Sequence, residues 1–221
     1  FNSVTANQSA EAFIEHICNT LDIRKLLIGH DFRFGKNRLG DKDFLLSCSH
    51  KLGYELAVID DHVLAQNRIS STLIRQELQS CQQHSSQELK VKQYLGRNYG
   101  FSGRVIHGQK KGRQLGFPTL NIQVKARQLL LPKGVYAVKI MHKNESYQAM
   151  ANWGVRPTVA SKLELVLEAN VFDFDKSIYG EKVYIEFIAK IRDEKKFQSL
   201  EQLKVQLTAD YESTRLFFTG S

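Results

Sequence analysis

The sequence predicts an α/β segment over residues 1–97, followed by an all-β domain with a terminal helix over residues 98–221. Up to about residue 97, short apolar strands alternate with helical segments, which is typical of a parallel sheet. After Gly96 the apolar residues recur at every second position, as they do in antiparallel strands. We therefore place the domain boundary between Tyr94 and Phe101.

Helices and strands alternate in the first part. We expect helices over residues 9–21, 41–53, 70–81 and 85–96, and strands over residues 25–29 and 55–59. Serine, threonine and aspartate favour helix N-termini, and glycine favours the position after the last helical turn. Gly53 and Gly96 end two of the helices, and the order of elements indicates a thin, mostly parallel sheet.

The second part contains six predicted strands and one helix. The strands are expected over residues 101–107, 117–124, 135–142, 146–152, 164–171 and 183–189. In the fifth strand Leu165, Leu167 and Ala169 share one face, and Glu168 and Asn170 share the other. Six short strands with tight turns suggest a closed antiparallel barrel. A helix over residues 200–217 has apolar residues at helical spacing, so we expect it to pack on that barrel.

Composition limits the function classes. The chain is 42% hydrophobic and 24% charged, with no apolar run near the roughly 18 to 20 residues that span a bilayer, so no membrane partner is expected. Cys18, Cys48 and Cys81 lack CxxC spacing, which favours free thiols in the cytoplasm. Residues 1–97 hold 12 Lys/Arg against 11 Asp/Glu, and residues 98–221 hold 19 against 12. This excess favours an anionic partner, which a phosphorylated small molecule and a nucleic acid both satisfy.

Residues 112–121, GRQLGFPTLN, combine a glycine-rich basic turn with two oxygen-bearing side chains. Gly112 and Gly116 allow the backbone to approach a phosphate closely, and Pro118 is tolerated where a strand begins. Alternation then places Thr119 and Asn121 on one face, with the residue between them toward the core. A surface hairpin that enters a strand is the alternative interpretation.

Glu168 is a carboxylate in an otherwise apolar strand. It is either a solvated outward residue or a base that lines a barrel mouth. Phosphoryl transfer to a hydroxyl needs a phosphate cradle, a hard cation with oxygen ligands and a proton acceptor. With Thr119 and Asn121, Glu168 would complete that set.

The motifs of residues 98–217 resemble those of riboflavin kinases. In the family's order they are GRV at 103–105, HG at 107–108, GFPTLN at 116–121, LP at 131–132, GVY at 134–136, Asn152, RPT at 156–158, LE at 167–168, FDFD at 172–175, YG at 179–180, and IRDE at 191–194 with Phe197. The resemblance implies a six-stranded riboflavin kinase barrel that converts riboflavin and ATP into FMN and ADP.

The resemblance also implies a role for individual residues. Glu168 would accept the proton of the ribityl hydroxyl, and Thr119 and Asn121 would bind the Mg²⁺ that accompanies ATP. The implied ATP-binding residues are Gly108, Lys110, Gly112, Arg113, Gly116, Pro118 and Thr119; whether Lys110, Lys111 or Arg113 contacts phosphate stays open. The implied flavin-binding residues are Arg192, Glu194 and Phe197, and core packing is an equal alternative for Phe197.

Residues 1–97 resemble the FMN adenylyltransferase module of bifunctional bacterial riboflavin kinase/FAD synthetases. The resemblance is carried by GHDFRFG at 29–35 with Arg38, GD at 40–41, and ISSTLIR at 69–75. The implied site consists of Asp31, Phe32, Arg38, Ser70, Ser71, Thr72 and Arg75. Ser70 to Thr72 either cap a helix only or, with Arg75 one turn inside it, form an anion site.

The HxGH motif with which this module begins in the family is not found among the seven histidines. The resemblance therefore implies an incomplete Rossmann-like nucleotidyltransferase module, and we expect no FMN adenylylation by this chain. The alternative function is a basic barrel that binds single-stranded nucleic acid through aromatic residues such as Tyr99, Phe101, Tyr136, Tyr147 and Trp153. Aromatics do not alternate with Lys/Arg along one strand, so we expect riboflavin and ATP, and no nucleic acid, as partners.

Overall fold

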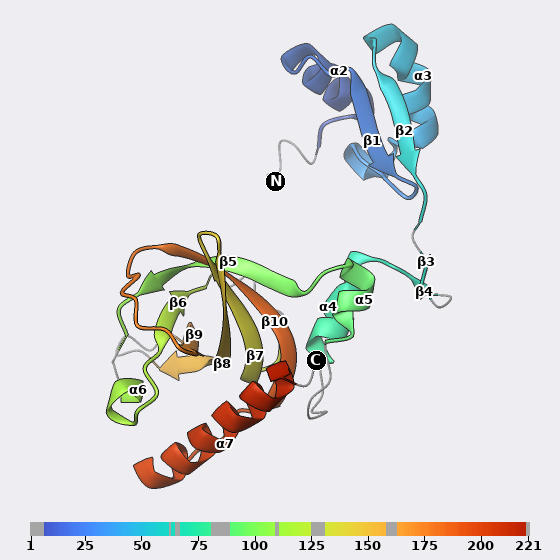
Figure 1. Ribbon diagram of the computed structural model, residues 1–221. Helices are drawn as coiled ribbons and strands as arrows, with labels where there is room; N and C mark the ends of the chain where they lie inside the picture. The colour runs from blue at the N-terminus through green and yellow to red at the C-terminus, as the bar shows by residue number, and fades with distance from the viewer. Residues whose placement is uncertain are drawn as a thin grey trace. The chain divides into compact units, whose positions relative to one another are not determined.

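The computed structural model describes residues 7–61, 63–64, 67–80, 89–108, 111–124, 131–157 and 163–219. The chain forms two compact units, which divide between Ile69 and Ser70 (Figure 1). The compact units therefore do not divide where the hydrophobic periodicity changes. The functional domain boundary near residue 97 stays a prediction.

The first unit is a small α/β layer. Helices α2 (Ala10–Thr20) and α3 (Lys42–Leu52) begin at Ser9 and Asp41, whose side chains accept hydrogen bonds from the backbone N–H groups of the first helical turn. Strands β1 (Lys25–Gly29) and β2 (Glu55–Ile59) pair in parallel, as predicted. The unit also has a short helix η1 (Lys36–Arg38) and a two-stranded ribbon of β3 (Val63–Leu64) and β4 (Asn67–Arg68). Its buried apolar residues are Ile14, Ile28, Leu45 and Tyr54.

Two helices of the second unit precede its strands. The hydroxyl of Ser70 accepts a 3.2 Å hydrogen bond from the backbone of Leu73, which starts α4 (Ser71–Gln79) as predicted. Helix α5 (Val91–Leu95) ends at Gly96 in a left-handed conformation. Leu78 of α4 is 1% exposed and belongs to the hydrophobic core of the barrel. Cys81, Ser85 and Ser86, at the predicted ends of these helices, lie outside the described residues.

Six antiparallel strands close into a barrel, which confirms the predicted fold (Figure 1). They are β5 (Tyr99–Ile106), β6 (Leu120–Gln123), β7 (Gly134–His142), β8 (Glu145–Pro157), β9 (Leu163–Val171) and β10 (Lys182–Asp193), in the order β10-β5-β6-β9-β8-β7. Alternate side chains fill the interior, and Tyr136, Leu167 and Phe187 are 0% exposed. A short helix, α6 (Lys111–Gln114), occupies the place where we expected only a turn.

The terminal helix α7 (Leu200–Thr219) packs on the outside of the barrel, as predicted, against β7, β8 and β10 (Figure 1). Strands β7 and β10 are consequently buried on both faces over part of their length. Within the described residues, no helix is long and apolar enough to cross a membrane.

The structure argues against the nucleic-acid alternative. Phe101, Tyr136 and Trp153 are 6%, 0% and 4% exposed and belong to the barrel core. Stacking on nucleic-acid bases requires exposed aromatic faces. These three side chains are therefore packing residues and cannot form the expected stacking platform.

Candidate active site

A row of side chains crosses the outer wall of the barrel. The strand register places Asn121 of β6 opposite Glu168 of β9, and Glu168 opposite Asn152 of β8. Since Leu167 is 0% exposed in the interior, alternation directs Glu168 outward. The row continues through the paired residues of β7 and β10, Val135 and Arg192. Glu168 therefore lies half-buried on the outer wall of the barrel, and its role as a base stays a prediction.

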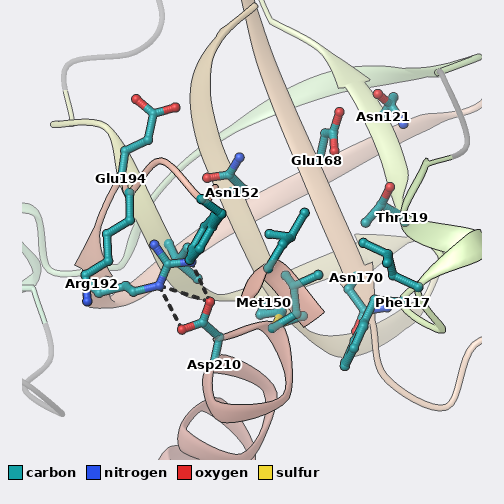
Figure 2. Close-up of a pocket in the computed structure, with 17 residues that line it drawn as sticks. Phe117, Thr119, Asn121, Met150, Asn152, Glu168, Asn170, Arg192, Glu194 and Asp210 are labelled. Carbon is teal, nitrogen blue, oxygen red and sulfur yellow. Dashed lines mark hydrogen bonds and ion pairs between the residues drawn. The ribbon is translucent and has the colours of Figure 1, made fainter. Parts of the chain in front are cut away.

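These side chains line a pocket between the barrel wall, α7 and residues 192–197, with a volume of about 290 Å³. Figure 2 shows Thr119, Asn121 and Glu168 at one end of the pocket and Arg192 and Glu194 at the other. The remaining lining is largely apolar: Leu115, Phe117, Val135, Met150, Phe197, Leu203 and Leu207. The structure thus brings the residues predicted for catalysis, metal binding and flavin binding into one pocket.

A second pocket, with a volume of about 360 Å³, lies beside the first. It is lined by Arg113 and Pro118 on one side and by residues 174–179 on the other, and these include Lys176. Thr119 is the residue that the described linings of both pockets share. The two pockets therefore meet at a predicted metal ligand, and the second one has both cations, Arg113 and Lys176, and the carboxylate of Asp175 in its lining.

The glycine-rich turn before β6 is closed by its own backbone. The N–H groups of Leu115 and Phe117 donate to the carbonyl of Gly112 at 3.1 and 2.9 Å. A Cβ atom on Gly112 would overlap the carbonyl oxygen of Phe117, and Gly116 has a φ of 87°, so both positions require glycine. The local structure is thus a short helix and a turn that lead into β6, and Thr119 lines both pockets.

Gly108 lies against the carboxamide of Asn121, which a Cβ atom would overlap. Asn121 is 6% exposed, so its side chain has little room to move. Leu120, between the two predicted metal ligands, is partly buried and packs against the barrel core, as predicted. Lys110 lies outside the described residues, as does the side chain of Lys111.

Arg192 forms a buried ion pair with Asp210 of α7. Its Nε atom donates to Oδ1 and Oδ2 at 2.8 and 3.0 Å, and its Nη2 atom donates to Oδ2 at 2.7 Å. Arg192 is 9% exposed and Asp210 is 2% exposed. The guanidinium also lies 5.8 Å from the ring centre of Phe197. Arg192 therefore fastens α7 to the end of β10 while it lines the pocket (Figure 2).

Sequence reasoning missed Asp210. The signal was present, because Asp210 falls on the helical stripe that contains Leu203, Leu207 and Thr214, and a carboxylate on such a stripe needs a buried partner. Asn152 was noted only as a motif residue. Its place in the row beside Glu168 depends on strand register, which the sequence does not state.

The residues predicted for adenylyl transfer fall into both units. In the first, Arg68 lies 2.8 Å from a carboxylate oxygen of Asp31, and its hydrogen bond lowers the pKa of that carboxyl. Phe32 stacks on Phe34 with ring centres 5.5 Å apart, and Arg38 lies in η1 with a φ of 59°. The second unit holds the others, at the start of α4: Ser70, Ser71, Thr72 and Arg75. This site stays a prediction.

The riboflavin kinase family model matches residues 95–218, and the FAD synthetase family model matches residues 1–73. The chain is 42% identical over 222 residues to the bifunctional riboflavin kinase/FMN adenylyltransferase of Haemophilus influenzae. The match covers 100% of this chain and 70% of the relative. The chain belongs to this bifunctional family. The resemblance stated from the motifs is thereby confirmed for both parts of the chain.

Two further similar proteins match almost the whole chain. The bifunctional riboflavin kinase/FMN adenylyltransferase of Escherichia coli K12 is 36% identical over 220 residues, with 99% of this chain and 67% of the relative covered. A crystal structure from Streptococcus pneumoniae, described as a macrolide-efflux protein, is 31% identical with a TM-score of 0.76, over 97% of this chain and 67% of that one. The chain is therefore a riboflavin kinase, an enzyme that uses ATP and riboflavin, and its relatives are bifunctional.

Proposed function

We propose that the pocket on the outer wall binds riboflavin, that the adjoining pocket binds ATP, and that phosphoryl transfer takes place where they meet. The observation that carries this proposal is Thr119, which lines both pockets beside the row of Asn121 and Glu168. The apolar lining of the first pocket suits a flavin ring. Arg113 lines the second pocket and offers a cation to the phosphates, while Lys176 in the same lining pairs with Glu145 at 2.7 Å.

Glu168 acts as the general base in this proposal. Its carboxylate accepts the proton of the terminal ribityl hydroxyl, whose oxygen then forms a bond to the γ-phosphorus of ATP. The bond from that phosphorus to the β–γ bridging oxygen breaks, and ADP leaves. The cross-strand neighbours Asn121 and Asn152 keep the carboxylate between two carboxamides, which can hydrogen-bond but bring no competing charge.

Thr119 and Asn121 fit a magnesium site. A hydroxyl and a carboxamide supply the neutral oxygen ligands that Mg²⁺ accepts when phosphates and water complete its coordination. Asn121 is confined between Gly108 and the wall of the barrel, so its oxygen needs little ordering on binding. When bound there, Mg²⁺ would offset the negative charge of the phosphate oxygens.

Further residues surround the two substrates. Gly108, Gly112 and Gly116 have no side chain at three positions of the turn, which leaves room for the nucleotide there, and Arg113 and Pro118 line the ATP pocket. At the flavin end, the carboxylate of Glu194 lies so close to β8 that a Cβ atom on Gly154 would be 2.7 Å from it. Arg192 and Phe197 close that end of the flavin pocket. We also propose that the enzyme works in the cytoplasm, because the spacing of its three cysteines is not that of a disulfide framework or a CxxC site.

The test is FMN formation from riboflavin and ATP with Mg²⁺. Glu168→Gln should lower kcat by about 10² to 10⁴-fold, the usual contribution of a general base, while riboflavin still binds. The matched control is Glu186→Gln, which removes a half-buried carboxylate from the barrel strand β10 away from both pockets and should leave kcat unchanged. A Glu168→Gln enzyme with the kcat of the parent would overturn the assignment.

A further inference from the structure

We propose that Asn170 is a positioning residue that holds Thr119 at the junction of the two pockets. Asn170 lies on β9 two residues beyond Glu168, is 6% exposed and lines the flavin pocket. Its Nδ2 atom donates a 2.7 Å hydrogen bond to the carbonyl oxygen of Pro118. The inference rests on the proposed function, in which Thr119 is a metal ligand.

The hydrogen bond from Asn170 to Pro118 joins the two strands just beyond the last paired residues of β6 and β9. Pairing of β6 with β9 begins at Leu120, which lies opposite Ala169. One step outward along both strands, Thr119 comes opposite Asn170. Pro118 has no N–H group, so its carbonyl oxygen is the one backbone group through which it can hydrogen-bond to β9.

The bond fixes the orientation of Thr119. The carbonyl of Pro118 and the nitrogen of Thr119 belong to one planar peptide unit. A donor that holds this carbonyl therefore restricts rotation of the whole unit and of the Cα atom that carries the Thr119 side chain. On the other side of Pro118, the turn is closed by the bond from Phe117 to Gly112, so the Asn170 bond joins that turn to the strand of the catalytic base.

Removal of the donor should loosen the metal ligand and spare the barrel. Ala169 and Val171, the neighbours of Asn170, are 0% and 8% exposed in the barrel core and keep β9 in place. A leucine at position 170 fills the space of the amide but leaves the Pro118 carbonyl without this donor. A histidine can donate from Nδ1, which is as many bonds from Cα as Nδ2 of asparagine.

The experiment measures ADP affinity by calorimetry with and without Mg²⁺, together with KM for ATP and for riboflavin, on the full chain. The Mg²⁺ gain is the factor by which Mg²⁺ raises the affinity for ADP. In Asn170→Leu this factor should be roughly tenfold smaller than in the parent, which is the effect of about one hydrogen bond. KM for ATP should rise more than KM for riboflavin, because the lost bond acts on Thr119 at the junction of the two pockets. Asn170→His should restore the Mg²⁺ gain, and Asn170→Ala replaces the leucine variant if that one does not fold.

Two further variants separate the possible outcomes. Thr119→Val removes the proposed ligand itself, and Gln123→Leu removes an exposed amide from the other end of β6 as the matched control. If Thr119→Val loses the Mg²⁺ gain and the Asn170 variants keep it, the inference is wrong and the metal site stands. If Thr119→Val keeps the Mg²⁺ gain, the metal role of Thr119 is wrong, and the inference that depends on it is wrong too.

Discussion

Replacement of Asp210 by alanine should lower the free energy of unfolding of the barrel unit by about 3–5 kcal/mol, the cost of breaking a buried ion pair. The carboxylate accepts hydrogen bonds from Nε and Nη2 of Arg192 and, at 2.9 Å, from Nε2 of Gln206. Alanine leaves the Arg192 guanidinium, which is 9% exposed, without its counter-charge. Because both partners are almost fully buried, water screens little of this loss.

The barrel carries its own probe for this measurement. Trp153 is the single tryptophan of the sequence, is 4% exposed, and donates to the carbonyl of Leu131 at 3.1 Å. Its fluorescence therefore reports unfolding of the barrel unit and not of residues 1–69. At a urea dependence of about 2 kcal/mol per molar, the predicted loss moves the midpoint down by about 1.5 to 2.5 M.

A double variant tests the electrostatic reasoning. Arg192→Met combined with Asp210→Leu leaves no uncompensated charge, so it should be more stable than Asp210→Ala alone. A midpoint that moves by less than about 0.5 M in Asp210→Ala would refute the predicted magnitude. A double variant that loses the sum of what Arg192→Met and Asp210→Leu lose singly would show that the residues do not act as a pair.

Two more predictions concern the turn before β6 and the far end of β7. Gly108→Ala should lower kcat/KM for FMN formation about a hundredfold, because the new methyl group displaces Asn121, and unchanged kinetics would contradict this. Hydrogen bonds from His142, at 2.7 Å, and from Lys143 lower the pKa of Glu181. A lowered folded pKa stabilises the protein above the ordinary carboxyl pKa of about 4.3, and this contribution is lost as the pH falls below it. The melting temperature of the parent should therefore exceed that of Glu181→Gln at neutral pH, and the difference should vanish in acid. A difference that stays constant from pH 3 to 7 would rule the effect out.

Local signals in the sequence were sufficient to predict the elements. Ser9, Asp41 and Ser70 cap helices because their side-chain oxygens satisfy N–H groups that a first helical turn leaves unpaired. Alternation along residues 163–171 was sufficient to put Glu168 on the face opposite the interior side chain of Leu167. Both kinds of inference need only neighbours within a few residues, which is why they succeeded.

The surfaces against which these elements pack could not be predicted from local signals in the sequence. Helix α4 begins within the motif at 69–75 that carries the adenylyltransferase resemblance, yet Leu78 packs in the barrel core. Periodicity identifies a buried face without saying which surface covers it. For the same reason the Arg192–Asp210 pair was not predicted, since the two residues lie 18 positions apart on different elements.

The alternation along β9 also makes this strand sensitive to length. Leu167 fills the barrel and Glu168 faces the pocket, so neighbouring residues serve folding and catalysis in turn. A single inserted residue would exchange the two faces, placing a carboxylate in the apolar interior and a leucine beside the substrates. Substitutions on one face can vary independently of the other, but any change in the length of β9 would damage stability and activity together.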